Sequence, residues 1–205
     1  MFILQNFKHL NLTGSLKHIR KFSNNRLSTN KMSVTYEDVM KYWFGEDLAS
    51  LKTDPYQPRF QLWYSSGIDE ELRTKFGEVL KKAENDELND WKGVADGEMA
   101  LIILMDQFSR NIYRGSADSF KNDAKALELA KNIIDNPAKH DQYSTFEKKF
   151  IYMPLMHSED VAMQKLCVKK IEELEKTVAD SHKGAIAMNL KYGREHCEIV
   201  EKYEF

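Results

Sequence analysis

Cysteines, prolines and long hydrophobic runs are scarce in this 205-residue chain, and each shortage excludes a class of structure. The two cysteines, Cys167 and Cys197, are isolated and form no CxxC pair, so no disulfide framework is expected and both are predicted to be small buried apolar residues. No run of 18 apolar residues occurs, so the chain is not expected to span a membrane. The four prolines fall where helices are expected to break.

The sequence signatures of several catalytic classes are also missing. There is no GxSxG nucleophile motif, no glycine-rich phosphate loop and no HExxH zinc motif, so the sequence indicates no particular cofactor. The only candidate metal ligands lack a recognisable spacing, and no metal is predicted. These candidates are Asp106, His157, Glu159 or Asp160, and His196.

Charge is divided unevenly along the chain. The first 36 residues hold six basic side chains and no acidic one, whereas the remaining 24 basic and 32 acidic residues leave a net charge of −8. An acidic domain has little electrostatic reason to bind nucleic acid or anionic lipid, so neither partner is expected.

The basic amino-terminal segment has the composition of a mitochondrial transit peptide. It is rich in Ser, Thr and Asn, and it places Ile3, Phe7 and Leu10 at helical spacing opposite Lys8. Residues 20–23, Arg-Lys-Phe-Ser, resemble a matrix-protease cleavage site.

We therefore expect residues 1–32 to direct the protein to the mitochondrial matrix. Two alternatives stay open: the segment is a disordered basic tail, or translation from Met32 gives a cytoplasmic form without it. In each case residues 33–205 are expected to form a single all-helical domain.

From Thr35 onward almost every periodic segment has the spacing of an α-helix, and no alternating run of strand length appears. Capping residues and helix breakers predict where these helices begin and end. The predicted helices run from a Thr35 cap to Gly45, over 69–85, over 96–113, from a Ser116 cap toward Pro137, from a Ser144–Glu147 capping box to Pro154, from a Ser158 cap onward, and through Ile186 and Val200. The short connections between them predict antiparallel helix pairs.

The same patterns assign residues to the interior or the surface. Trp43, Trp63 and Trp91 are expected in the core rather than in a ligand groove. His140 and His182 lie in polar stretches and are expected to be exposed to solvent. The helix after Ser116 is expected to face inward through Phe120, Ala124, Leu127 and Ile134.

The most informative segment is LIILMDQFSRNIYRG, residues 101–115. Its apolar residues recur at the spacing of a helix that is buried over much of its circumference. A buried helix usually carries charged side chains only where a ligand or another polar group contacts it. Its polar side chains, Asp106, Gln107, Arg110, Asn111 and Arg114, are therefore candidate site residues.

Two interpretations of these polar residues have equal weight. In the first, they bind a ligand in a groove, because Arg110 and Arg114 have no acidic residue four positions on within the predicted helix and suit a phosphate or carboxylate. In the second, Asp106 and Arg110 form an ion pair within the helix, and Asn111 bonds to a neighbouring loop.

A second polar cluster, His157-Ser158-Glu159-Asp160, follows an apolar run. A Ser158 cap with both acidic residues in the first helical turn is what the helix dipole favours without any ligand. His157 is not required by that account. It suits a general base, a metal ligand or an anion-binding group.

These blocks, taken together with others in the same order, resemble the domain-of-unknown-function family number 924 over roughly residues 36–203. The other blocks are Trp43-Phe44-Gly45, residues 63–76, Trp91, and Phe120 with Asp123-Ala124. The resemblance implies a fold similar to the tetratricopeptide-like helical arrays and no established activity. Ser109 stands where that family favours proline. Family members also continue into a basic loop beyond this chain's Phe205, and if that loop completes their site, altered activity is expected here.

We expect an all-α, tetratricopeptide-like right-handed array of antiparallel helix pairs that binds a small anionic molecule or an acidic peptide. The groove would be lined by Arg110, Asn111, Arg114, Gln107 and His157.

The alternative is a hydrolase acting on a phosphorylated or carboxylated metabolite. His157 would be its general base, Asp106 or Glu159 would orient that base, and Arg110 would stabilise developing negative charge. An enzyme needs these groups to converge on one site, whereas a binding module needs them spread along an open groove.

Overall fold

The computed structural model describes residues 33–46, 62–63 and 67–203, and within them every regular element is a helix. The all-α prediction is therefore confirmed for this part of the chain. The proposed transit peptide, residues 1–32, lies outside the described residues, as do Pro55 and Pro58. The elements are α1 (Tyr36–Phe44), α3 (Asp69–Glu84), η2 (Asn89–Trp91), α4 (Ala95–Ile102), η3 (Ile103–Phe108), α5 (Ser109–Ile112), η4 (Ala117–Phe120), α6 (Asp123–Ile134), α7 (Pro137–His140), α8 (Thr145–Met156), α9 (Val161–Thr177) and α10 (Asp180–Tyr203).

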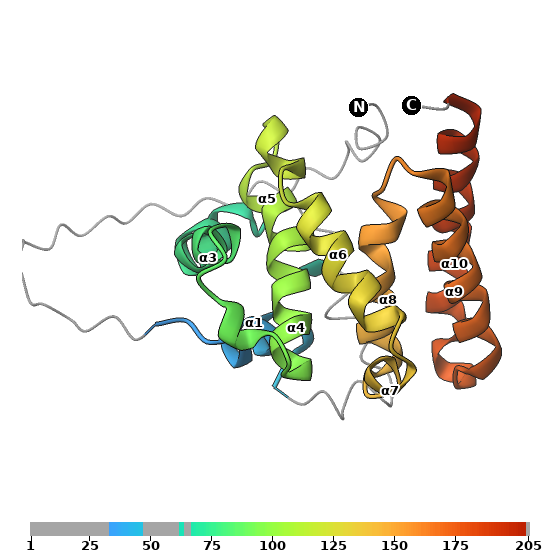
Figure 1. Ribbon diagram of the computed structural model, residues 1–205, viewed down its shortest axis with the longest axis horizontal. Helices are drawn as coiled ribbons and strands as arrows, with labels where there is room; N and C mark the ends of the chain where they lie inside the picture. The colour runs from blue at the N-terminus through green and yellow to red at the C-terminus, as the bar shows by residue number, and fades with distance from the viewer. Residues whose placement is uncertain (1–32, 47–61, 64–66, 204–205) are drawn as a thin grey trace, which may run out of the picture. The chain divides into compact units, whose positions relative to one another are not determined.

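The helices pack as a series of neighbours (Figure 1). α4, η3 and α5 form one continuous helix, which contacts α1 and α3 as well as α6 and α8. α9 packs on α8, and α10 packs on both. The ion pairs from Glu172 to Arg194 and from Lys165 to Glu201 show that α9 and α10 run antiparallel.

Local capping signals explain where two of the helices begin. The Thr35 hydroxyl accepts a hydrogen bond from the Asp38 backbone N–H, while the Asp38 carboxylate accepts from the Thr35 N–H at 2.9 Å. Ser144 and Glu147 form the same capping box at the start of α8, as predicted. Each box satisfies backbone donors that the helix itself cannot pair.

α8 does not stop at Pro154, contrary to the sequence expectation, but continues to Met156. The proline ring removes one backbone donor. The missing donor would have bonded back to the Phe150 carbonyl, so the hydrogen bonds after Pro154 are unaffected, and the His157 N–H bonds to the Met153 carbonyl at 2.9 Å. The helix therefore extends as far as His157, its C-cap residue.

The predicted Ser158 cap of the next helix is wrong by two residues. Asp160 caps α9 by accepting a hydrogen bond from the Ala162 N–H at 2.7 Å. The Ser158 hydroxyl instead accepts from the Asp160 N–H, so Glu159 and Asp160 precede the helix rather than form its first turn. Aspartate and serine both serve as helix caps, and the sequence alone does not choose between two candidates this close together.

The three tryptophans lie in the core, as predicted. The Trp63 indole N–H donates to the Trp43 carbonyl at 2.9 Å, and its ring meets Phe150 edge-on at 4.9 Å. Trp91 is buried as well, and Cys167 and Cys197 are free and buried. Aromatic packing thus joins α1, the described residues 62–63 and α8.

The predicted inner face of α6 is only partly correct. Ser116 caps the short η4 helix, and α6 begins separately at Asp123, which changes the rotational phase of the following residues. As a result Phe120 is 52 % exposed and Ala124 is also exposed, whereas Ile134 is buried as expected. The buried residues of α6 are Ala126, Leu129, Ala130, Ile133 and Ile134.

The expectation that His140 and His182 face solvent is wrong. His182 is buried and its ring meets Phe146 edge-on at 5.0 Å. His140 is half-buried, and its Nε2 lies 2.7 Å from the Tyr152 hydroxyl. Polar neighbours in the sequence misled the prediction, because burial depends on which face of the chain a residue occupies.

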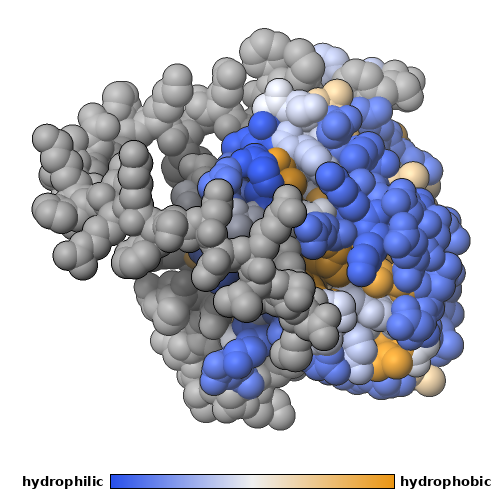
Figure 2. Space-filling view, turned by 90° about the vertical axis from the view of Figure 1, so that its left-hand side faces the viewer, coloured by the Kyte–Doolittle hydropathy of each residue, from blue (hydrophilic) through white to orange (hydrophobic). Residues whose placement is uncertain are grey.

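The surface of the described residues is mostly hydrophilic on the face in Figure 2, with a few small hydrophobic patches. None of the described helices combines the length and the apolar character needed to cross a bilayer.

Candidate functional site

The helix that carries the candidate site residues is interrupted by a π-helical segment, η3 (Ile103–Phe108). The Ser109 N–H bonds to the Leu104 carbonyl, five residues back, instead of four. All six residues of η3 are buried, including Asp106 and Gln107. Short π-helical segments are rare overall, and those that occur often lie at functional sites. They redirect side chains that a regular helix would place elsewhere.

Asp106 and His157 form the central contact of this site. Asp106 is completely buried, and its Oδ1 lies 2.6 Å from His157 Nδ1. The Gln107 side chain donates from Nε2 to the other carboxylate oxygen, Oδ2, at 2.5 Å. The His157 side chain, at the end of α8, keeps 16 % of its surface exposed. A buried acid thus holds a histidine that solvent still reaches.

The Asp106 carboxyl is ionised at neutral pH. Burial raises its pKa, but the charge and hydrogen bond of His157, the charge of Arg110 and the hydrogen bond of Gln107 together lower the pKa below its ordinary value of 3.8. An ionised carboxylate only accepts hydrogen bonds, so His157 Nδ1 carries the proton in this contact. In the neutral ring Nε2 is then the free acceptor.

Arg110 has a closer partner than the one predicted. Its guanidinium forms two hydrogen bonds to Asp123, from Nη1 to Oδ1 at 2.7 Å and from Nη2 to Oδ2 at 3.0 Å, whereas Asp106 Oδ1 lies 4.0 Å away. Arg110 also donates to the Ser119 carbonyl, and its guanidinium lies over the Phe120 ring. The predicted Asp106–Arg110 pair is therefore the weaker of two contacts.

Arg114 is also bound to a carboxylate. It donates from Nε and Nη2 to Asp69, at 2.6 and 3.1 Å, and from Nη2 to Asn111 Oδ1 at 2.6 Å. The Asn111 amide donates to the Gln107 carbonyl, so the predicted bond to a neighbouring loop is wrong. Each guanidinium thus already has an acidic partner, which reduces its capacity for an external anion.

The sequence-predicted residues separate into two groups. Asp106, Arg110 and His157 converge, because both basic groups approach the same oxygen, Asp106 Oδ1. Glu159 and Asp160 are exposed, and the Asp160 carboxylate is engaged in capping α9. Among residues 33–46, 62–63 and 67–203, no three His, Cys, Asp or Glu side chains are grouped so that they could hold a metal ion.

Sequence reasoning missed two buried polar residues, Lys149 on α8 and Gln164 on α9. Both residues are 1 % exposed. The Lys149 ammonium lies 5.1 Å from the Trp63 ring centre, and burial lowers its pKa to about 8. The helical spacing could have identified both residues. Lys149 follows the buried Phe146 by three residues on α8, and Gln164 precedes the buried Cys167 by three residues on α9.

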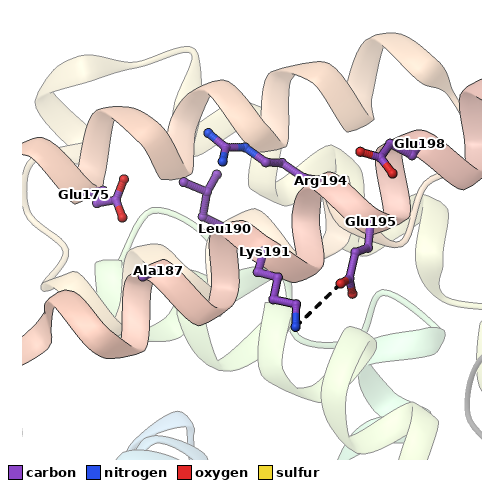
Figure 3. Close-up of a pocket in the computed structure, with 7 residues that line it drawn as sticks. All are labelled: Glu175, Ala187, Leu190, Lys191, Arg194, Glu195 and Glu198. Atoms are coloured by element: carbon purple, nitrogen blue, oxygen red, sulfur yellow. Dashed lines mark ion pairs between the residues drawn. The ribbon is translucent and has the colours of Figure 1, made fainter.

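A hollow of about 500 Å³ lies elsewhere, on the outer side of α9 and α10 (Figure 3). Its charged groups include the ion pair between Lys191 and Glu195, and Arg194 is bound to Glu172. None of the residues around Asp106 and His157 lines it. The lining residues are Glu175, Ala187, Leu190, Lys191, Arg194, Glu195 and Glu198.

Comparison with known proteins identifies similar sequences and folds without an assigned activity. Residues 39–204 match the family described as "Bacterial protein of unknown function (DUF924)". A solved structure of a protein of unknown function from Agrobacterium tumefaciens is 24 % identical, with a TM-score of 0.65 over 82 % of this chain and 84 % of that one. No curated protein matches. The structural likeness shows that the two proteins share a fold.

Proposed function

The chain belongs to the family described as bacterial protein of unknown function, DUF924, and for this member we propose a hydrolytic activity in which His157 is the general base. One observation carries the proposal: the 2.6 Å contact between the fully buried Asp106 and the partly exposed His157. Burying an ionised carboxylate costs free energy unless the carboxylate is fully paired. A histidine with only a structural role does not need such a partner in the core.

The proposed chemistry is proton transfer from water. Asp106 holds the proton on Nδ1, so Nε2 is free to accept a proton from a water molecule as that water attacks the substrate. The carboxylate then stabilises the imidazolium that forms. Arg110 lies close enough to Asp106 to favour its ionised form.

The proposed substrate is a phosphorylated or carboxylated metabolite. Its anionic group would compete with Asp123 for Arg110, since Asp123 now occupies both guanidinium nitrogens on that edge. The side chains of Arg110 and Asp123 are 19 % and 29 % exposed, so this edge is accessible to a ligand in part.

Hydrolysis of p-nitrophenyl phosphate and of mono-p-nitrophenyl succinate, an ester with a free carboxylate, by the full chain tests the proposal. His157→Gln and Asp106→Asn should each lower the rate by roughly 10²- to 10⁴-fold, the usual contribution of a general base. His140→Gln is the matched control, because His140 is another half-buried histidine with a hydrogen-bonded partner, Tyr152. Equal rates for the wild type and His157→Gln would refute the assignment.

A second candidate is binding of a small anionic molecule or an acidic peptide. One observation favours it: the side chain of Arg114 is 44 % exposed. Arg114 donates to Asn111, and Asn111 in turn donates to the Gln107 carbonyl. A ligand that binds the native state raises its apparent stability. Inorganic phosphate should therefore raise the melting temperature of the wild type but not that of Arg114→Ala, and equal shifts would count against this role.

Two further proposals concern architecture and location. The antiparallel α9–α10 pair supports a tetratricopeptide-like right-handed array, which helix-crossing angles from an experimental structure would test. The acid-free basic composition of residues 1–32 supports import into the mitochondrial matrix. A fluorescent fusion to residues 1–36 should accumulate in mitochondria, and diffuse cytosolic signal would contradict this.

A further inference from the structure

One side chain of α9 binds the backbone on both sides of His157. Gln164 donates from Nε2 to the Met156 carbonyl at 2.6 Å and to the Ser158 carbonyl at 2.5 Å. Met156 and Ser158 are the residues immediately before and after His157. The two N–H groups of one amide thus fix both carbonyls that flank the proposed base.

These carbonyls need partners from outside their own helix. The Met156 carbonyl is the last of α8, and the last carbonyls of a helix have no backbone donor within it, while Ser158 lies beyond the helix end. Gln164 is 1 % exposed and therefore replaces water as the donor at this helix end. Its orientation is determined, because reversing the amide would place Oε1 against two carbonyl oxygens.

His157 is consequently held from two separate elements. Asp106, on η3, binds the ring through Nδ1, and Gln164, on α9, binds the backbone that carries the ring. A ring nitrogen acts as a base only when it points at its target within hydrogen-bond reach. Fixing the backbone and Nδ1 together also fixes the direction of Nε2.

We propose that Gln164 is a positioning residue for His157, which gives the proposed general base its fixed orientation. Its importance for catalysis rests on the hydrolytic function proposed above, but the positioning itself does not. Within the described part of the chain the Gln164 Oε1 atom has no hydrogen-bond partner. The amide is thus retained in the core for its two donors, although its acceptor remains unsatisfied.

The test is the imidazole Nδ1–H resonance of His157 in the ¹⁵N-labelled full chain. In the wild type the hydrogen bond to Asp106 should slow exchange of this proton and make it visible. Gln164→Met keeps the shape of the side chain but removes both donors, so the resonance should be lost while the circular dichroism of the helices is unchanged.

Gln142→Met is the matched control. Gln142 also donates from Nε2 to a backbone carbonyl next to a helix end, that of Ala138, at 3.0 Å, but it is exposed and away from His157. The His157 resonance should survive in this variant. Its survival in a folded Gln164→Met variant would overturn the proposal.

If Gln164→Met does not fold, Gln164→Asn provides the answer, because the side chain stays a neutral amide but is one methylene too short to reach both carbonyls. The resonance should then weaken or disappear, and its full persistence in a folded Gln164→Asn variant would count against positioning. Hydrolysis assays separate the two proposals. Unchanged hydrolysis by His157→Gln refutes the general base, whatever the resonance shows, while an unchanged resonance in Gln164→Met refutes positioning alone.

Discussion

Arg110 binds Asp123 through two parallel hydrogen bonds, and this pair is largely shielded from solvent. One helical turn further on, Arg114 binds Asp69 with the same two-pronged geometry, yet its side chain is 44 % exposed. The continuous helix therefore presents two similar arginine–carboxylate pairs that differ mainly in burial. This difference allows the energetic value of burial to be measured within one protein.

Arg110→Ala should cost far more stability than Arg114→Ala. Removing Arg110 leaves Asp123 unpaired and removes a nearby positive charge from the buried Asp106, so we expect a loss of about 3 kcal/mol in the free energy of unfolding. Arg114→Ala breaks a more exposed pair and should cost about 0.5 to 1 kcal/mol. Urea denaturation of both variants measures these values, and equal losses would show that Arg110 and Asp123 are solvated in solution.

The close approach of Gly97 to Trp91 leads to the next prediction. A Cβ atom at Gly97 would lie 2.3 Å from the Trp91 carbonyl oxygen, which belongs to the backbone and cannot move aside easily. Gly97→Ala should therefore destabilise the protein by about 2 kcal/mol or more. Gly77, inside α3, has open space around it, so Gly77→Ala should stabilise by about 0.5 to 1 kcal/mol. Thermal melting of the two variants should move in opposite directions.

The starts of α1 and α8 were predictable, because their capping signals are local. Thr35 and Asp38, like Ser144 and Glu147, are three residues apart and act on each other directly. The π-helical turn was not predictable in the same way. It changes the backbone pairing of residues 103–108 without changing the apolar spacing that identifies a helix.

The site was predictable in its members but not in its contacts. Asp106, Arg110 and His157 were recognised as polar residues bordering apolar helices, yet their closest partners depend on packing between distant segments. Asp106 and His157 are 51 residues apart, and Arg110 reaches Asp123 beyond its own helix. Gln164 and Lys149 were missed because polar and charged residues are usually exposed, and their positions on buried helix faces were given less weight than their residue type.

The buried Lys149 leads us to expect that the free energy of unfolding rises as the pH becomes alkaline. Burial lowers its pKa to about 8 in the folded protein, against an ordinary value of 10.5. Between these two values the unfolded chain binds more protons at this site than the folded protein does, so raising the pH favours the folded state. The free energy of unfolding should rise by up to about 3 kcal/mol between these pH values. Lys149→Met should lack this increase, and parallel wild-type and variant curves would contradict the assigned burial.

Asp106 predicts a loss of stability in acid. Its pKa is lowered in the folded protein from the ordinary 3.8, because the effects of His157, Arg110 and Gln107 exceed the opposing effect of burial. The unfolded chain therefore takes up a proton at a higher pH than the folded protein. The stabilisation from this carboxylate is fully present above about pH 5 and is lost as the pH falls through the folded-state pKa.

Asp106→Asn should reveal this contribution as a difference that shrinks in acid. At pH 7 the variant loses hydrogen bonds to a charged group and should be less stable than the wild type by about 2 kcal/mol. Below the folded-state pKa the wild-type carboxyl is itself neutral, so the two proteins should converge. Urea titrations of both at pH 7, 5 and 3 measure the difference. A gap that stays constant down to pH 3 would contradict a lowered pKa for Asp106, because the unfolded chain takes up its proton near the ordinary pKa of 3.8 whatever the folded-state pKa is.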